Sequence, residues 1–94
     1  MIQKVDILVF AAHPDDAELG CSGTILNQIH KGNKVAIVDL TKGELGSRGT
    51  AEIRSQESAA STKILGLTAR MNAEFADGFF ESDKEHCLKL VEYI

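Results

Sequence analysis

Two nearly continuous apolar segments constrain the fold of this chain more than any other feature. Residues 5–12 (V-D-I-L-V-F-A-A) and residues 34–40 (K-V-A-I-V-D-L) are rich in β-branched side chains. They lack the strict alternation that is typical of a strand exposed on one face. Such runs indicate strands that are buried on both faces, as in a parallel sheet. Residues 18–31 carry apolar side chains three or four positions apart, and Gly32 follows them. This spacing predicts a helix that connects the two strands.

The next segment repeats the same arrangement. Thr50 is a good N-cap residue, and it precedes a predicted helix over residues 51–65. The apolar spacing places Ile53, Ala60 and Ile64 on the inner face of this helix. We therefore expect a second crossover back to the sheet.

The last third of the chain predicts one more strand and one more helix. Residues 67–75 alternate between apolar and polar side chains, which favours a half-buried strand near a sheet edge. Ser82 and Glu85 have the spacing of a capping box, so a final helix is expected from there to Ile94. The order β-α-β-α-β-α predicts an α/β, Rossmann-like parallel sheet with helices on both faces. Three strands are few for a complete sheet of this kind, so residues 1–94 are interpreted as one incomplete, N-terminal portion of a domain.

Composition excludes several classes of partner. The chain has a net charge of −4 and no basic excess, so we expect no binding to nucleic acid or to acidic membranes. No apolar run approaches the roughly 20 residues of a membrane span. The two cysteines, Cys21 and Cys87, form no zinc-type or redox-type pair, which is typical of a reducing compartment. These features predict a cytoplasmic protein.

The segments that follow the predicted strands carry most of the chemistry. They are His13-Pro14-Asp15-Asp16, the glycine-containing residues 42–50, and Asp77. Ligands of open parallel sheets bind at the carboxyl ends of the strands, so the three segments are expected at one edge. The first lacks the G-x-G-x-x-G of a dinucleotide fold and the second lacks the G-K-[ST] ending of a phosphate loop. We therefore expect no nicotinamide or flavin dinucleotide, and the glycines of the second segment are expected to allow tight turns.

His13 and Asp16 supply one imidazole and one carboxylate, three positions apart. This pair suits a borderline divalent cation such as zinc, and Asp15 between them could accept a proton from water. The residues alone leave a second interpretation open. Asp15 or Asp16 could be the N-cap of the following helix, with His13 as an ordinary loop histidine.

Three longer motifs resemble a known enzyme family. Residues 12–24 (A-H-P-D-D-A-E-L-G-C-S-G-T) resemble the signature of the zinc-dependent N-acetylglucosaminyl deacetylases related to PIG-L and LmbE. Residues 41–57, which begin T-K-G-E-L-G-S-R-G-T, and residues 77–81 (D-G-F-F-E) resemble the bacillithiol-biosynthesis branch of that family. Members of this branch deacetylate N-acetylglucosaminyl-malate. The resemblance implies a hydrolase of small acetylated glucosaminides that forms a homo-oligomer as the full-length enzyme.

The resemblance also implies roles for individual residues near the first motif. His13 and Asp16 would be zinc ligands, although the ligand types also admit another divalent metal. Asp15 would be the general base that activates water for attack on the acetamide carbonyl.

Four further residues are implied as substrate neighbours. Arg54 would hold the substrate or balance charge near Asp15, and Asp77 would hydrogen-bond a sugar hydroxyl. Glu44 and Arg48, in the glycine-containing segment, would lie close to the substrate.

One part of the family pattern is missing from this sequence. The family takes a third zinc ligand from a histidine motif after a fourth strand, and neither His30 nor His86 matches that motif. We therefore expect residues 1–94 alone to be inactive.

Two alternatives to the bacillithiol assignment remain at this stage. One is a deacetylase or amidase of the same superfamily that acts on another N-acetylglucosamine conjugate. The other is a magnesium-dependent phosphoacceptor module of the receiver type, in which Asp15 and Asp16 would bind the cation and Asp77 would accept the phosphoryl group.

Overall fold

The computed structural model describes residues 4–45 and 50–94. It confirms the predicted order of elements and the parallel sheet. The three strands pair side by side in the order β1-β2-β3, and both pairs are parallel. The elements are β1 (Ile7–Ala11), α1 (Asp16–His30), β2 (Val35–Asp39), α2 (Ala51–Leu65), β3 (Ala69–Asn72) and α3 (Lys84–Val91).

The pairing register brings the carboxyl ends of the strands to one edge. Ala11 at the end of β1 pairs with Asp39 at the end of β2, which in turn pairs with Asn72 at the end of β3. β2 is the middle strand and is buried along its whole length. This explains its nearly continuous apolar sequence, whereas β3 lies at an edge, as its alternating sequence predicts.

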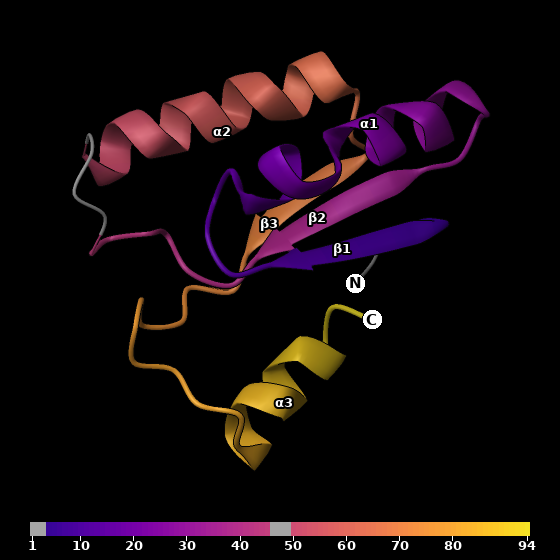
Figure 1. Cartoon of the computed structure of the whole chain (residues 1–94). Coiled ribbons are helices and arrows are strands. Elements are labelled where there is room, and N and C mark those ends of the chain that lie inside the picture. The colour runs from indigo at the N-terminus through magenta and orange to yellow at the C-terminus, as the bar shows by residue number, and fades with distance from the viewer. Residues whose placement is uncertain (1–3, 46–49) are drawn as a thin grey trace.

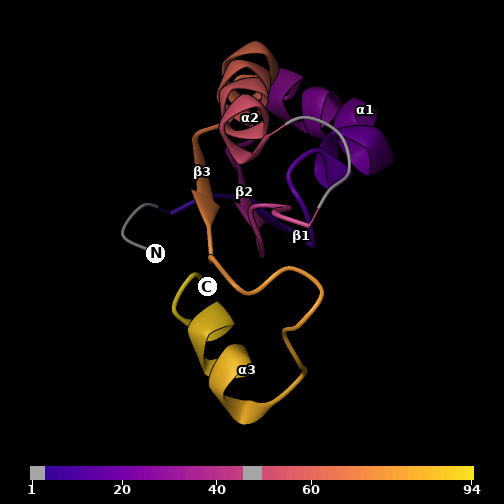
Figure 2. The same ribbon diagram turned by 90° about the vertical axis from the view of Figure 1, so that its left-hand side faces the viewer.

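The helices cover both faces of the sheet, but unequally. α1 and α2 lie side by side on one face, and α3 lies on the opposite side (Figures 1 and 2). Two right-handed crossovers that step in the same direction place their helices on the same face, which accounts for the pairing of α1 with α2. The main core lies between α1 and the β1–β2 pair, around Ile25, Val35 and Ile37.

The inner face of α2 differs from the prediction. Ile53 and Ile64 are 46% and 81% exposed, and Ala60 is exposed as well. The half-buried positions include Arg54 and Thr62 instead. α2 packs against α1, and the groove between α2 and β3 is lined mainly by polar side chains of both elements, so a polar helix face fits there.

The predicted ends of α1 and α2 are confirmed at their caps. The Thr50 hydroxyl accepts a hydrogen bond from the Ile53 N–H at 3.1 Å. Gly66 ends α2 and Gly32 follows α1, with φ angles of 78° and 93°. These angles lie in the left-handed region, where glycine avoids the cost that a Cβ would add.

α3 is shorter and less buried than its sequence suggests. Its N-cap is Asp83 and not Ser82, because the Asp83 carboxylate accepts the His86 N–H at 2.9 Å. The helix ends at Val91, and none of its residues is buried. The His86 ring packs edge-on against Phe75 with centroids 4.7 Å apart.

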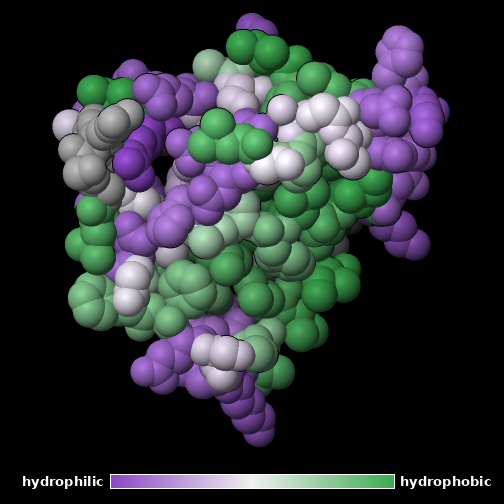
Figure 3. Space-filling model, in the orientation of Figure 1, coloured by the Kyte–Doolittle hydropathy of each residue, from purple (hydrophilic) through white to green (hydrophobic). Residues whose placement is uncertain are grey.

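Apolar side chains remain at the surface near α3. Figure 3 shows them gathered across the middle of the molecule, between the helical layer and α3. Phe10 of β1 is 38% exposed, and Val91 and Ile94 at the end of the chain are 60% and 82% exposed. Among the described residues, no helix combines the length and the apolar character that crossing a membrane requires.

Candidate functional site

The three loops at the carboxyl edge are joined through their backbones, as the sequence predicted. The Leu40 N–H donates to Ala11 O at 2.7 Å, and the Thr41 N–H donates to Ala12 O at 3.2 Å. The Phe75 N–H donates to Leu40 O at 2.8 Å. The fully buried Thr41 hydroxyl donates a further bond to Ala12 O at 3.0 Å. The loop after β2 therefore connects the loops on either side of it.

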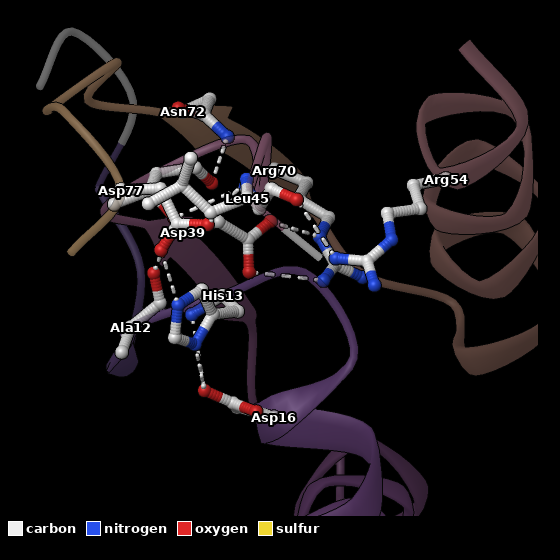
Figure 4. Close-up of polar contacts among 11 residues, drawn as sticks. Ala12, His13, Asp16, Asp39, Leu45, Arg54, Arg70, Asn72 and Asp77 are labelled. Carbon is white, nitrogen blue, oxygen red and sulfur yellow. Dashed lines mark hydrogen bonds and ion pairs between the residues drawn. The ribbon is translucent and has the colours of Figure 1, made fainter. Parts of the chain in front are cut away.

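His13 lies between two carboxylates at this edge (Figure 4). Its Nε2 lies 2.6 Å from Asp77 Oδ1, and its Nδ1 lies 3.3 Å from Asp16 Oδ2. The same Asp16 oxygen accepts the His13 N–H at 3.0 Å. The side chains of His13 and Asp16 are 42% and 45% exposed, whereas that of Asp77 is 7% exposed. Asp77 thus lies beneath the imidazole, and Asp16 lies on its accessible side.

Asp77 is held by both neighbouring loops. Its Oδ2 accepts the Leu45 N–H at 2.9 Å, and its own N–H donates to Glu44 Oε2 at 3.1 Å. The Leu45 N–H is the largest cause that lowers the pKa of Asp77 below its ordinary value, and His13 and Arg54 lower it further against the effect of burial. The bond to Asp77 is also the main cause of the raised pKa of His13. The predicted contact of Asp77 with a sugar hydroxyl stays a prediction, and both carboxylate oxygens accept hydrogen bonds inside the chain.

Asp15 occupies a strained backbone position beside this pair. It is the N-cap of α1 with φ 87° and ψ −17°, and its side chain makes no capping hydrogen bond. A left-handed conformation costs a non-glycine residue on the order of 1–2 kcal/mol, and aspartate is among the residues that tolerate it. Such strain gathers at functional sites, where the surrounding structure maintains it. Asp15 is thus the N-cap by position, but its side chain does not form the capping hydrogen bond that the second interpretation of the sequence required.

The functional side chains surround a shallow hollow. It has a volume of about 450 Å³. Its lining consists of His13, Asp15, Asp16, Leu45, Arg54, Asp77 and Gly78. A larger groove of about 630 Å³ runs between α2 and β3, but neither His13 nor Asp15 nor Asp16 lines it. The chemistry of the side chains, and not the size of the cavity, therefore identifies the candidate site.

Arg54 reaches the hollow from the first turn of α2, as predicted. Its Nη1 donates to Gly43 O at 3.0 Å. Gly43 has a φ of 67°, and a Cβ at this position would collide with the Arg54 guanidinium. Glycine at position 43 therefore permits both the turn and the close approach of the arginine.

The other residues considered for the site are not brought to the hollow or are not described. Glu44 is absent from the lining and contributes through its bond to the Asp77 backbone. Arg48 lies outside the described residues. His30 is at the far end of α1 and His86 is on α3, so neither is brought to His13. Within residues 4–45 and 50–94, no group of three or more His, Cys, Asp or Glu side chains is arranged to hold a metal ion.

The donor pair nevertheless fits part of a zinc site. Zinc takes imidazole nitrogen and carboxylate oxygen at about 2.0–2.2 Å, usually in tetrahedral geometry. Two ligand atoms of one tetrahedral zinc are then about 3.3–3.5 Å apart. His13 Nδ1 and Asp16 Oδ2 lie 3.3 Å apart, so they fit as two ligands of one ion.

Sequence reasoning missed one set of residues next to the site. The sequence placed Arg70 of β3 only among the polar positions of a half-buried strand, but its side chain is 6% exposed and forms ion pairs with Glu18 and Asp39. In the sheet register Arg70 pairs with Ile37, which belongs to the buried core beneath α1. The available signal was the acidic residue in the middle strand, because a buried Asp39 requires a partner.

Comparison with known proteins places the chain in a family. Residues 8–94 match the family described as PIG-L: GlcNAc-PI de-N-acetylase. An uncharacterized deacetylase, YaiS of Escherichia coli K12, is 41% identical over 75 residues, which are 80% of this chain and 40% of YaiS.

Two solved structures share the fold. The conserved protein TT1542 of Thermus thermophilus has 47% identity and a TM-score of 0.89, over 96% of this chain and 41% of that one. The N,N'-diacetylchitobiose deacetylase of Pyrococcus horikoshii has 26% identity and a TM-score of 0.85, over 93% of this chain and 35% of its own. The chain thus spans about two fifths of the length of these relatives. On the match over residues 8–94 and the shared fold, this chain belongs to the PIG-L de-N-acetylase family.

Proposed function

We propose that this chain is the metal-binding part of a zinc-dependent N-deacetylase that acts on an N-acetylglucosaminyl conjugate. The observation that carries the proposal is the His13–Asp16 donor pair, which lies in one hollow with Asp15 and Arg54. The family match supports the reaction class. The motifs of residues 41–57 and 77–81 favour N-acetylglucosaminyl-malate, the bacillithiol precursor, as the substrate.

In this mechanism each side chain of the hollow has one role. His13 Nδ1 and Asp16 Oδ2 would hold the metal, and Asp77 fixes the orientation of the His13 ring. A bound zinc supplies Lewis-acid polarisation of the acetamide carbonyl and lowers the pKa of water. The Asp15 carboxylate takes a proton from the attacking water and delivers it to the amine nitrogen as the C–N bond breaks. Acetate and the free amine leave.

Arg54 balances the charge of this acidic hollow. Among the described residues that line the hollow, three are aspartates and one, Arg54, is an arginine. Its guanidinium, which donates to Gly43 O, is a planar group with several N–H donors, a geometry suited to the carboxylate and hydroxyl groups of a substrate. A malate aglycone carries such carboxylates, and Glu44 and Arg48 are proposed as further neighbours.

The decisive experiment is an acetate-release assay on the protein as its natural source produces it. N-acetylglucosaminyl-malate, N,N'-diacetylchitobiose and free N-acetylglucosamine are compared at equal concentration, before and after treatment with a chelator. We expect turnover of the malate conjugate, loss of turnover on chelation and its return with zinc. A strong preference for N,N'-diacetylchitobiose would show that the substrate is an N-acetylglucosamine conjugate other than the malate one. Turnover that survives complete metal removal would refute the mechanism.

The same preparation tests the receiver-type alternative. Incubation with acetyl phosphate and magnesium would add a phosphoryl group to Asp77 in a phosphoacceptor module. The Asp77 side chain is 7% exposed and both of its oxygens accept hydrogen bonds, which disfavours that role. We expect the mass of the protein to stay unchanged.

A further inference from the structure

A second polar cluster lies beside the hollow and contains none of the proposed catalytic groups. Arg70 donates from Nε and Nη2 to the two oxygens of Asp39, at 2.7 and 3.0 Å. It also donates from Nη1 and Nη2 to the two oxygens of Glu18, at 2.9 and 3.1 Å. One guanidinium thus joins β3 to the end of β2 and to the first turn of α1.

The burial of this cluster makes its geometry specific. The side chains of Arg70, Glu18 and Asp39 are 6%, 18% and 3% exposed. Burial disfavours the charged guanidinium, but the bonds to Asp39 and Glu18 raise the pKa of Arg70 overall. Removing these charges from water costs free energy, so the ion pairs add little net stability. They instead favour one arrangement of the three side chains.

The segment that Glu18 belongs to is separated from the main part of α1 by a kink. α1 is interrupted at Cys21, where φ is −147° and ψ is 25°, so Asp16–Gly20 is a short piece before the main helix. Figure 1 shows α1 as two coiled pieces. A Cβ at either Gly20 or Gly23 would meet no atom within 4 Å, so nothing is packed closely against these two positions. The first piece is packed on the core through the buried Ala17, and the Glu18–Arg70 bond is a polar anchor beside it.

This short piece carries the chemistry of the proposed site. It begins with Asp16, and Asp15 directly before it has the strained left-handed backbone. The Leu19 N–H of this piece donates to Asp15 O at 2.9 Å. Glu18 lies two residues from Asp16 and connects the piece to the sheet through Arg70.

We infer that Arg70 is a positioning residue that, through Glu18, holds the first turn of α1 so that Asp15 and Asp16 face His13. This inference rests on the proposed function for its catalytic meaning. In structural terms, we expect the Glu18–Arg70 ion pair to order residues 15–20. The Asp39–Arg70 ion pair joins only β2 and β3. Replacing Glu18 is therefore expected to disorder residues 15–20, whereas replacing Asp39 is expected to affect the contact between the strands.

Glu18→Gln and Asp39→Asn form a matched pair, because each replaces with a neutral amide one of the two carboxylates that bind the Arg70 guanidinium. Both variants are prepared in the protein as its natural source makes it, and backbone hydrogen exchange is measured on the metal-free form. We expect Glu18→Gln to speed exchange in residues 15–20 about tenfold, because a buried charged hydrogen bond is weakened. Asp39→Asn is expected to leave that segment within about twofold of the unchanged protein.

A second measurement relates the order of the segment to the metal. Zinc affinity is determined by competition with a chromophoric chelator, and we expect it to fall about tenfold in Glu18→Gln and less in Asp39→Asn. Equal exchange in residues 15–20 for the two variants would overturn the inference and leave Arg70 a general stabilising residue. If the unchanged protein binds no zinc, the proposed function fails, while the exchange data still decide the positioning role.

Discussion

Asp77 accepts a hydrogen bond from the imidazole of His13 although the two residues lie 64 positions apart. The distance between His13 Nε2 and Asp77 Oδ1 is 2.6 Å, and Asp77 is itself fixed by the N–H of Leu45. A carboxylate that accepts one ring N–H of a histidine keeps the proton on that nitrogen and leaves the other nitrogen available to a metal. The available nitrogen here is Nδ1, on the side of Asp16.

Asp77→Asn tests this relationship directly. The amide is a weaker acceptor than the carboxylate and can turn its NH₂ group towards the ring, so the His13 ring loses its fixed orientation. We expect zinc affinity to fall about 10–100-fold, measured by chelator competition. Asp83→Asn is the matched control, because Asp83 also lies 2.6 Å from a histidine ring nitrogen, that of His86 on α3, far from the hollow. A control variant that lost as much affinity as Asp77→Asn would contradict the assignment.

Asp15→Asn separates proton transfer from metal binding. The substitution keeps the shape of the side chain and tolerates the left-handed backbone, but it removes the base. We expect kcat to fall about 10²–10⁴-fold with unchanged zinc content, measured by acetate release and elemental analysis. His13→Ala is expected instead to lose the metal. Near-normal turnover by Asp15→Asn would assign the base to another residue.

The left-handed backbone of Asp15 predicts an unusual order of stability. At a φ of 87°, glycine has no Cβ to strain, whereas alanine has one and lacks the tolerance of aspartate. We expect Asp15→Gly to be more stable than Asp15→Ala by about 1 kcal/mol, measured by denaturant unfolding. Equal stability of the two variants would mean that the residue does not keep this conformation in solution.

The N-cap of α2 predicts a cost in stability outside the hollow. Thr50→Ala removes the acceptor of the Ile53 N–H, which loses its partner at the helix start. We expect a loss of about 1 kcal/mol in unfolding free energy. Thr24→Ala is the control, because Thr24 is exposed within α1 and alanine has the higher helix propensity. An equal loss of unfolding free energy in Thr24→Ala would contradict the explanation by capping.

The N-terminus of α3 is expected to be less stable in acid. The His86 N–H bond is the largest cause of the lowered pKa of Asp83, followed by the bond from the His86 ring. A carboxyl whose pKa is lower in the folded state stabilises that state above the unfolded pKa, near 3.8. The contribution is lost as the pH falls through the lower, folded-state value. The His86 amide resonance should therefore shift below about pH 4, and Asp83→Asn should abolish that shift. An unchanged acid shift in Asp83→Asn would point to another group.

The sequence by itself determined the parallel sheet and the edge at which the candidate site lies. The apolar runs of β1 and β2 reflect burial on both faces, which local composition records directly. Gly32, Gly66 and Thr50 mark helix ends, because their preferences are local properties of the backbone. The carboxyl ends of parallel strands necessarily share one edge, so the meeting of His13 with the loops after β2 and β3 followed from the strand order alone.

Only the tertiary structure decided which side chains form partners across that edge. The pattern of β3 marked Arg70 only as a polar position, and the tertiary structure places it beside Asp39 and Glu18. The face of α2 was also assigned incorrectly, because its polar side borders a groove that it shares with β3 and its predicted apolar positions are exposed. A period of two or of 3.6 residues specifies faces but not what covers them. Contacts such as His13–Asp77 and Glu18–Arg70 depend on how whole elements pack against one another, and that information is not local to any segment of the chain.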